Sequence, residues 1–385
     1  MVMWNRASTQ LRTYKRWFSS DSTRRTYAAL WGNGDFGRLG LGNLDSQWRP
    51  RLLPPSAFGN HGLKSIACGG AHTLFLTETG RVYATGLNDF GQLGISGNDN
   101  YTMEPIEVSG LKKEAVQISA GYHHSCAITA DGELYMWGRN SNGQLGLGKK
   151  GQSVVPLPTK VECLSGLTIK MVALASEHSI GVTVGGEALS WGGGGSGQLG
   201  HGNQSSILGF LRSTSEYTPR RITKLEGVKV KNVAAGFLHS ACVDANGSIF
   251  VFGERAIGRL VVENCMLGDP TKMVALVSVL LTPFIYQKEL KVLFQDLRLK
   301  RSPVVGSTQL QFLKATSTPG VGEVLMDHFL KMGILLADNC ICIQGHGSDV
   351  DYGNPTMVTF EKNVKALQVS CGFNHTGAIL ESAET

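Results

Sequence analysis

The chain alternates between short apolar runs and turns that are rich in Gly, Asn and Asp. Runs such as Thr73–Leu76, Ser125–Thr129 and Ser240–Val243 are each followed by a tight turn. The turn pairs are Thr79-Gly80, Asp131-Gly132, Gly185-Gly186 and Asn246-Gly247. Because Gly and Asn adopt the positive φ that a two-residue hairpin needs, the pattern predicts antiparallel sheets of about four short strands.

A first repeated signature joins an aromatic or small residue and Gly to a downstream Gly-Gln-Leu-Gly or Gly-Arg-Leu-Gly loop. The dipeptides are Trp31-Gly32, Thr85-Gly86, Trp137-Gly138, Trp191-Gly192 and Phe252-Gly253. Successive copies are 52 to 61 residues apart. A fixed period of this length is typical of repeat folds such as propellers. We expect the Trp residues to be wedges between neighbouring sheets.

A second signature is a Gly or Ala, two residues and a His, placed just before one of the predicted strands. Its histidines are His72, His124, His178, His239 and His375. Five histidines can indicate acid–base or metal chemistry, but one position per repeat is spread around a ring and does not converge on a ligand. The interpretation favoured here is a hydrogen-bonded, structural His.

The two ends of the chain each contain half of a repeat. Trp31 is preceded only by the predicted strand Thr26–Leu30, and the His375 signature runs into Ala378-Ile379-Leu380 without a following Trp-Gly. Pairing the two ends would complete one sheet and remove its exposed edges. The interval from Gly253 to Gly345 is close to two periods. The prediction is an all-β, seven-bladed β-propeller closed by its N- and C-terminal strands, with one blade eroded or replaced.

These motifs resemble the regulator of chromosome condensation repeat family, whose members are seven-bladed propellers. The resemblance covers residues 27–260 strongly and 327–380 in part, and it extends to exchange-factor-like and ultraviolet-B photoreceptor-like propellers. With its N-terminal segment, the chain is similar to plant mitochondrial members of the family. The resemblance implies a supporting role in organellar gene expression, namely intron splicing of a complex I subunit transcript and complex I biogenesis.

The N-terminal segment differs in charge from the rest of the chain. The chain has 36 Lys and Arg against 30 Asp and Glu, a net charge of +6, and four of the basic residues lie in the first 20 positions, which contain no acid. Such an Arg-rich, acid-free start is typical of an organelle transit peptide. We predict a mitochondrial matrix protein cleaved between Phe18 and Ser19; a disordered basic tail and a chloroplast address are the alternatives.

The predicted boundaries are a transit peptide at 1–18, a linker at 19–26, a propeller at 27–380 and a tail at 381–385. Residues 261–320 lack the repeat landmarks and carry Leu290, Leu293, Phe294 and Leu297 at helical spacing. This segment is interpreted either as a partly helical or disordered lobe that replaces a blade, or as the product of an imperfect gene model. The longest apolar run, Met273–Tyr286, is interrupted by Ser278 and Pro283 and is too short for a membrane helix.

The sequence predicts no catalytic residue, cofactor or metal site. Gly32, Gly34 and Gly37 match a dinucleotide-binding pattern, as do Gly192, Gly194 and Gly197. Dinucleotide binding needs a helix directly after this pattern. Here the pattern recurs at equivalent turn positions of two repeats, which favours a turn over a nucleotide site. Cys340 and Cys342 with His346 lack a second ligand pair for zinc. The eight Cys are scattered through the chain and are expected to be reduced thiols.

The resemblance implies two activities, each of which needs residues of its own. Guanine-nucleotide exchange on a small GTPase acts through one propeller face and an inserted wedge, and the insertion Ser205–Glu216 does not match a wedge. Ultraviolet-B photoreception needs Trp and Arg where this chain has Tyr122-His123 and Phe373-Asn374. The favoured hypothesis is therefore a non-enzymatic propeller that binds protein partners, with nucleotide exchange as the alternative.

The partner is predicted to be a protein, with a mitochondrial splicing factor as the candidate. Direct RNA contact is the alternative, through a basic stretch after the insertion. Its residues are Arg212, Arg220, Arg221 and Lys224. The simpler interpretation of this stretch is a solvated loop and strand edge.

Overall fold

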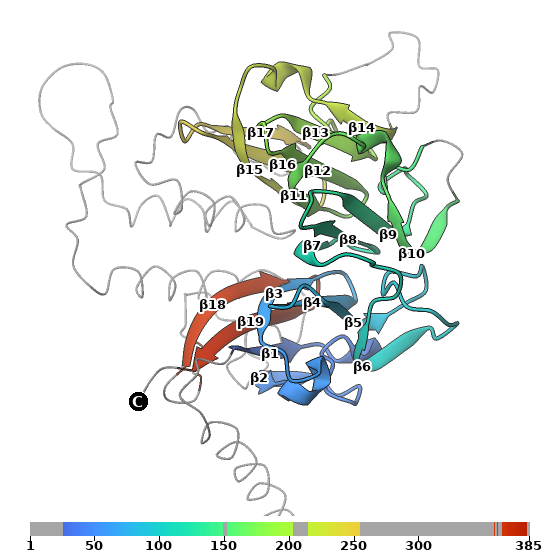
Figure 1. The fold of residues 1–385 in the computed structure, drawn as a ribbon, viewed down its shortest axis with the longest axis vertical. Helices are drawn as coiled ribbons and strands as arrows, with labels where there is room; N and C mark the ends of the chain where they lie inside the picture. Colours follow the sequence, from blue (N-terminus) through green and yellow to red (C-terminus); the bar gives the residue numbers. More distant parts are fainter. Residues whose placement is uncertain are drawn as a thin grey trace, which may run out of the picture.

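The computed structural model describes residues 26–148, 152–202, 215–254, 358, 360 and 364–382. They form five antiparallel sheets, which follow one another in chain order (Figure 1). The strands are β1 (Thr26–Gly32), β2 (Gln47–Leu52), β3 (Leu63–Cys68), β4 (His72–Thr77), β5 (Val82–Leu87), β6 (Tyr101–Glu107), β7 (Ala115–Ala120), β8 (His124–Thr129), β9 (Leu134–Arg139), β10 (Val154–Lys160), β11 (Ile169–Leu174), β12 (His178–Thr183), β13 (Ala188–Gly192), β14 (Glu216–Arg221), β15 (Val230–Ala235), β16 (His239–Asp244), β17 (Ile249–Gly253), β18 (Val364–Cys371) and β19 (His375–Ser382).

Short 3-10 helices occur in the loops at both ends of the sheets. They are η1 (Asp35–Gly37), η2 (Pro55–Phe58), η3 (Glu162–Leu164) and η4 (Thr223–Leu225). We name the sheets A (β18-β19-β1-β2), B (β3 to β6), C (β7 to β10), D (β11 to β14) and E (β15 to β17). Four of them have four strands, as the sequence predicts, and sheet E has three within the described residues.

The predicted pairing of the chain ends is confirmed. Strand β1 pairs antiparallel with β19 along its whole length, with Ala29 opposite Ala378 and Leu30 opposite Gly377. Strand β18 pairs with the other edge of β19, so sheet A combines the first two strands of the chain with its last two. The predicted start of the propeller at residue 27 lies one position from the observed start of β1.

The prediction of seven blades is wrong, because the described residues form a five-bladed propeller. The count of seven was obtained by dividing the interval from Gly253 to Gly345 by the repeat period. The length of an interval does not establish that its residues form strands, and this interval lacks the Trp-Gly and Gly-x-x-His landmarks of a full repeat. Almost all of the interval, including the divergent segment 261–320, lies outside the described residues.

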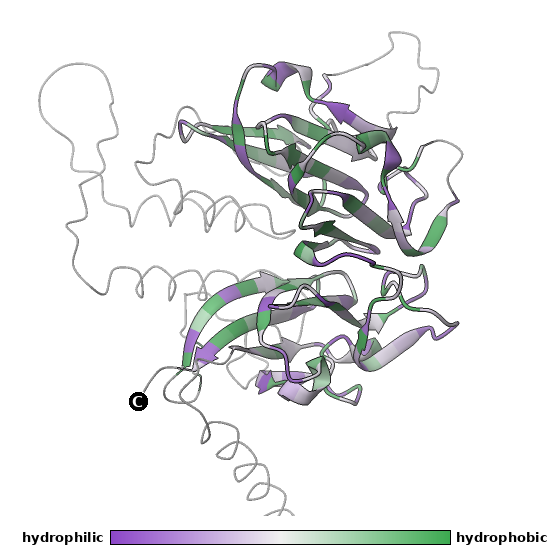
Figure 2. Cartoon of the chain, viewed as in Figure 1, coloured by the Kyte–Doolittle hydropathy of each residue, from purple (hydrophilic) through white to green (hydrophobic). Residues whose placement is uncertain are grey.

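The hydrophobic core lies between successive sheets. Leu74, Ile118 and Trp137, from sheets B and C, share one cluster, and Val172 and Trp191 belong to the cluster between sheets C and D. Figure 2 shows hydrophobic residues along the strands, whereas hydrophilic residues gather on β14 and on the loops. Side-chain amides add to the junctions, because the Gln117 amide bonds both the N–H and the C=O of Val172 in the next sheet.

Proline protects the outer strand of each four-stranded sheet. The prolines are Pro50 in β2, Pro105 in β6, Pro156 and Pro158 in β10, and Pro219 in β14. Proline has no N–H to donate, so it interrupts the edge that would otherwise pair with a foreign strand. These edges are therefore poor sites for the addition of a foreign strand.

Candidate functional site

The topology separates the loops into two faces. In each sheet the Gly-x-x-His turn joins the first strand to the second, and the loop after Trp-Gly leads from the third strand towards the fourth, so both lie at the same end of the sheet. We call this end the front face. The hairpins between second and third strands, such as Ala130–Glu133, lie at the other end, which we call the hairpin face.

The five signature histidines each begin a second strand, and four of them, His72, His124, His178 and His375, reach a hydroxyl group of the next sheet. All five are buried, and none is more than 7% exposed. His72 Nε2 lies 2.9 Å from Ser125 Oγ in the next sheet, and His178 Nε2 lies 2.8 Å from Ser240 Oγ. His375 bonds Thr73 at 2.8 Å, and His124 lies 3.5 Å from Ser179. The structure therefore separates these histidines by sheet and does not bring them together.

The hydrogen bonds fix the tautomer of these imidazoles. Ser125 Oγ donates its single hydrogen to the carbonyl of Gln92 at 2.7 Å, so it accepts from His72 Nε2–H. Nδ1 of His72, His124, His178 and His375 is buried without a hydrogen-bond partner in the described part of the chain. Burial lowers the pKa of His72, His124 and His178 to about 3, and it holds the pKa of His375 well below its ordinary value. The imidazoles are neutral links between sheets.

The Trp-Gly and Gly-Gln-Leu-Gly motifs meet at one backbone carbonyl. Trp137 Nε1 donates to the carbonyl of Gln92 at 2.9 Å, the same oxygen that Ser125 bonds. Trp191 repeats this arrangement at the carbonyl of Gln144, also at 2.9 Å. Trp31, Trp137 and Trp191 are at most 1% exposed. The loops Gly91–Gly94 and Gly143–Gly146 are thus each held by the Trp and the Ser of the following sheet, whereas the loop Gly197–Gly200 is held by Ser240 alone, because sheet E has Phe252 in place of the Trp.

The glycines of the Trp-Gly dipeptides share a close contact with the second strand of their own sheet. A Cβ built at Gly138 would lie 2.6 Å from the carbonyl oxygen of His123, and the backbone φ there is +105°. Both the short contact and the positive φ exclude a side chain at Gly138. The equivalent glycines with positive φ are Gly32, Gly86, Gly192 and Gly253.

We expect Gly121→Ala to lower the free energy of unfolding by about 1–3 kcal/mol, as is usual for overpacking. The added Cβ would lie 2.4 Å from Cε1 of His124 and 2.6 Å from the carbonyl oxygen of Ala175. Urea titration of the purified chain measures the change. Gly185→Ala is the matched control, since its nearest neighbour would be at 3.6 Å. Equal effects of the two substitutions would contradict the proposed packing of Gly on His.

An aromatic cluster occupies the front face where sheets A, B and C meet. Its members are Phe90, Tyr122, His123 and Phe373, all partly exposed. The ring centroids are 4.8 Å apart for Phe90 and His123, 4.5 Å for Tyr122 and His123, and 5.2 Å for Tyr122 and Phe373. The guanidinium of Arg139 lies 5.3 Å above the Phe90 ring. Burial, and secondarily Arg139, lowers the pKa of His123 to about 4.

Sequence reasoning did not identify this cluster. In the sequence, Tyr122, His123 and Phe373 stand out only as departures from the photoreceptor pattern. The cluster forms because Gly70 and Ala71, at the same positions in sheet B, leave space between their neighbours. A Cβ at Gly70 would lie 2.4 Å from the carbonyl oxygen of Tyr122 and 3.1 Å from its ring. The available signal was the recurrence of aromatic residues in solvent-facing turns.

Two of the four predicted RNA-contact residues are paired with carboxylates. Arg220 pairs with Glu216 at 2.6 Å, and Arg221 pairs with Glu187 at 3.1 Å. Lys224 lies in η4, and Arg212 lies outside the described residues. Phe18 and Ser19, at the predicted cleavage site, also lie outside them.

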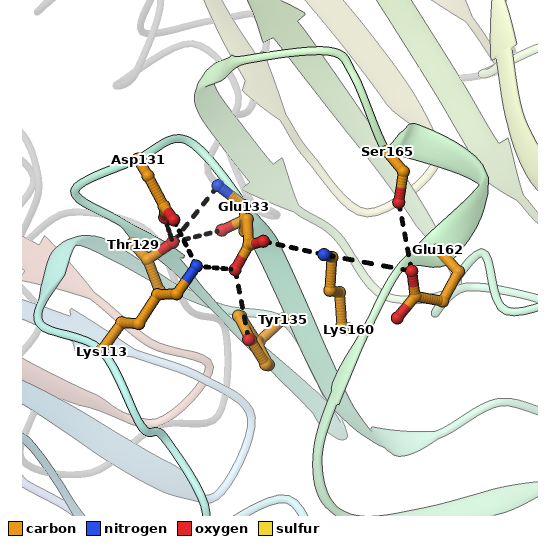
Figure 3. Close-up of polar contacts among 8 residues, drawn as sticks. All are labelled: Lys113, Thr129, Asp131, Glu133, Tyr135, Lys160, Glu162 and Ser165. Atoms are coloured by element: carbon orange, nitrogen blue, oxygen red, sulfur yellow. Dashed lines mark hydrogen bonds and ion pairs between the residues drawn. The ribbon is translucent and has the colours of Figure 1, made fainter.

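The hairpin face carries an ion-pair network in which Lys113 and Lys160 bind the carboxylates of Asp131, Glu133 and Glu162 (Figure 3). Lys113 pairs with both Asp131 and Glu133, and Glu133 also accepts from Lys160 at 2.7 Å. Hydrogen bonding from Lys113 lowers the pKa of Asp131 to about 2 and also lowers the pKa of Glu133. These side chains are partly exposed and pair with one another. We interpret the network as a structural feature of the surface, since exposed ion pairs contribute little to stability.

The described residues contain no cluster of three or more His, Cys, Asp or Glu side chains able to hold a metal ion. Within the same residues, no helix has the length and hydropathy needed to cross a membrane. The candidate functional site is the aromatic cluster on the front face.

Comparisons with known proteins agree with the class of fold, an all-β repeat propeller. The model of the RCC1-like domain matches residues 22–208, and the model of the regulator of chromosome condensation (RCC1) repeat matches residues 185–243. The ultraviolet-B receptor UVR8 of Arabidopsis thaliana is 32% identical over 356 residues, which cover 91% of this chain and 70% of UVR8. The chain belongs to the family of RCC1-like repeat propellers.

Other relatives match a smaller part of their own length. The probable E3 ubiquitin-protein ligase HERC6 of Homo sapiens is 31% identical over 228 residues, which cover 59% of this chain and 22% of HERC6. Among solved structures, yeast RCC1 (Prp20) bound to Kap60 aligns with a TM-score of 0.64 at 20% identity. That alignment covers 94% of this chain and 90% of Prp20, and at this identity it establishes the fold alone.

Proposed function

We propose that this chain is a non-enzymatic interaction propeller whose front face binds a protein partner. The observation that carries the proposal is the aromatic cluster, which spans three sheets at the surface. Aromatic side chains are enriched at the centres of protein interfaces, where they bury large areas at low entropic cost. Phe237, in the equivalent turn of sheet E, is 40% exposed and extends the aromatic character of this face.

The place of action that we propose is the mitochondrial matrix. Support comes from the Arg-rich, acid-free N-terminal segment and from the resemblance to plant mitochondrial members. There the propeller would support intron splicing of a complex I subunit transcript by holding a splicing factor. We propose that contact with RNA is indirect, because Arg220 and Arg221 are paired with carboxylates.

Affinity capture from mitochondria tests this proposal, with the full chain as bait and both proteins and RNA identified. Tyr122→Ala is expected to reduce recovery of the main partner at least fivefold, because it removes the central ring of the cluster. Val184→Ala is the control, since Val184 is an exposed apolar residue, 65% accessible, in the hairpin between β12 and β13 on the opposite face. Partners retained equally by both variants, or normal splicing of complex I transcripts in a knockout, would contradict the corresponding part of the proposal.

Guanine-nucleotide exchange is the second candidate function. It is favoured by the structural likeness to yeast Prp20, a protein studied for its binding to Gsp1p and histones. Release of labelled GDP from candidate small GTPases, with and without the full chain, separates the two candidates. Acceleration would favour exchange over the interaction role. Ubiquitin ligase activity is not proposed, because the chain spans only 22% of HERC6.

A further inference from the structure

A second group of exposed apolar side chains lies on the front face, where the loop after β1 meets the outer strand of sheet B. Its members are Phe36 and Leu44 in the loop and Tyr101 and Met103 at the start of β6, each 39–45% exposed. Tyr101 and Met103 share one face of the strand, because side chains alternate along a strand and the intervening Thr102 is buried. We call these four residues the rim patch. Exposed apolar side chains that gather in this way mark interaction sites.

Backbone contacts hold the loop against β6. Gly42 N–H donates to the carbonyl of Met103 at 2.8 Å. Gly37 approaches the strand so closely that a Cβ there would lie 2.6 Å from Cα of Met103. Thr85 Oγ1 lies 2.9 Å from the carbonyl oxygen of Gly37 and 3.0 Å from that of Thr102. The two parts of the rim patch therefore keep a fixed relation to each other.

The backbone of Phe36 is strained. Its φ is +59°, and among the described residues Asn60 is the only other non-glycine with a positive φ. The left-handed region is unfavourable for a bulky L-residue. Phe90, the equivalent residue of sheet B, has no positive φ, and its ring centroid lies 4.8 Å from that of His123. Phe36 instead keeps an exposed ring at a conformational cost, and such strain is concentrated at functional sites.

The exposed charged side chains around the rim patch are acidic. In residues 33–46 and 99–107 they are Asp35, Asp45, Asp99, Glu104 and Glu107. Within the described ranges only Glu107 of this set forms an ion pair, with Arg81 at 3.5 Å. The Glu104 carboxylate lies over the loop, since a Cβ at Gly42 would be 3.2 Å from its Oε1. The border of the rim patch is therefore negative.

The cations near this surface do not cancel that charge. Arg38, the one basic residue of these two segments, is only 4% exposed, and its guanidinium lies 5.8 Å from the Phe36 centroid. The Phe36 ring is 43% exposed with Arg38 in place. Arg49 and Arg51 belong to β2, which pairs with β1 and not with β6.

We propose that the rim patch binds a segment of the protein partner in which large apolar side chains alternate with Lys or Arg. The apolar side chains would pack on the four residues of the patch, and the cations would pair with Asp35, Asp45 and Glu104. Charge complementarity selects this occupant, because a negative border attracts cations and repels the phosphates of RNA and of anionic lipids. The inference rests on the proposed interaction function and names the chemistry of the partner.

Fluorescence anisotropy with the full chain and three fluorescein-labelled peptides tests the inference. The first peptide alternates Leu and Lys, the second alternates Ser and Lys, and the third alternates Leu and Glu. We expect saturable binding of the Leu–Lys peptide, binding of the Ser–Lys peptide that is about tenfold weaker, and no binding of the Leu–Glu peptide. The second peptide measures the contribution of charge alone, and the third measures non-specific hydrophobic adsorption.

Variants of the rim patch locate the binding. Tyr101→Ser and Met103→Ser are each expected to raise the Kd of the Leu–Lys peptide about fivefold, because each removes apolar area from the interface. Glu104→Gln is expected to raise the Kd about twofold to threefold. The controls are Val184→Ser and Glu226→Gln, which change an exposed apolar and an exposed acidic residue at the opposite end of the sheets and leave the Kd unchanged. Urea titration of each variant checks that it folds.

Three results would overturn the inference. They are no saturable binding of the Leu–Lys peptide, equal binding of the Leu–Lys and Leu–Glu peptides, and equal effects of Tyr101→Ser and Val184→Ser. Sedimentation of the full chain adds a fourth: a dimer that Tyr101→Ser abolishes would show that the occupant is a second copy of this chain.

The partner capture described above keeps this failure distinct from failure of the proposed function. If capture depends on Tyr122 while the Leu–Lys peptide does not bind, the chemistry assigned to the partner is wrong and the interaction function stands. If the Leu–Lys peptide binds as expected while capture is independent of Tyr122, the role proposed for the aromatic cluster is wrong and the rim patch stands.

Discussion

Lowering the pH from 7.5 to 5 is expected to bring the folded chain close to unfolding. The cause is the set of buried imidazoles between sheets, of which His72, His124 and His178 have a pKa lowered from 6.5 to about 3. Below pH 6.5 these histidines bind protons in the unfolded chain but stay unprotonated in the folded chain, so the free energy of unfolding falls as the pH falls. The loss continues until the pH reaches the folded pKa of about 3.

The expected size follows from linkage. Between pH 7.5 and pH 5, each imidazole that stays neutral in the folded state lowers the free energy of unfolding by about 2 kcal/mol. The three histidines together lower it by about 6 kcal/mol. His375 acts in the same direction. Domains of ordinary stability have only about 5–15 kcal/mol in total. Urea unfolding at pH 7.5, 6 and 5 measures this dependence, and an unchanged midpoint across the series would show that these imidazoles are accessible to protons in the folded chain.

Replacing Trp137 with Ala is expected to lower the free energy of unfolding by about 3–5 kcal/mol. The indole is fully buried between sheets B and C, and its Nε1 holds the carbonyl of Gln92 in the Gly-Gln-Leu-Gly loop. The substitution therefore removes a core side chain and a hydrogen bond at one junction. Urea titration at pH 7.5 measures the loss.

Trp48→Ala is the matched control for this prediction. Trp48 lies in the outer strand β2 and is partly exposed, so a loss of about 1 kcal/mol is expected. Trp137→Phe separates packing from the hydrogen bond, since it keeps a ring in the junction and removes the donor. Losses of equal size at Trp137 and Trp48 would be inconsistent with a role of the indole in joining sheets.

The repeats of the sequence predict the local structure well. The Gly-containing turns mark the observed hairpins, and the half repeats at the two ends pair as β1 and β19. These features are encoded by residues close together in the chain. The number of blades is not encoded in that way, because it depends on whether the residues between Gly253 and Gly345 form strands. Dividing that length by the repeat period gave the wrong count.

The candidate site was harder to predict than the fold. The motifs locate His124 and Trp137, but they do not show that Ser125 bonds the carbonyl of Gln92 in a different repeat. The aromatic cluster depends on Tyr122 meeting Phe373 across the small turn of sheet B, from a distant part of the chain. Likewise, the basic stretch after the insertion is visible in the sequence, whereas the pairing of Arg221 with Glu187 follows from the register of β13 and β14.

The central claim is that the first and last strands of the chain share one sheet, since this pairing places Phe373 beside Tyr122 on the front face. Hydrogen–deuterium exchange of the full chain and of an Ala378→Pro variant tests the claim most directly. Proline at 378 removes an N–H and disrupts β19. The account predicts slow exchange in Ala28–Trp31 of the native chain and much faster exchange there in the variant. Unchanged protection of Ala28–Trp31 in the variant would contradict it.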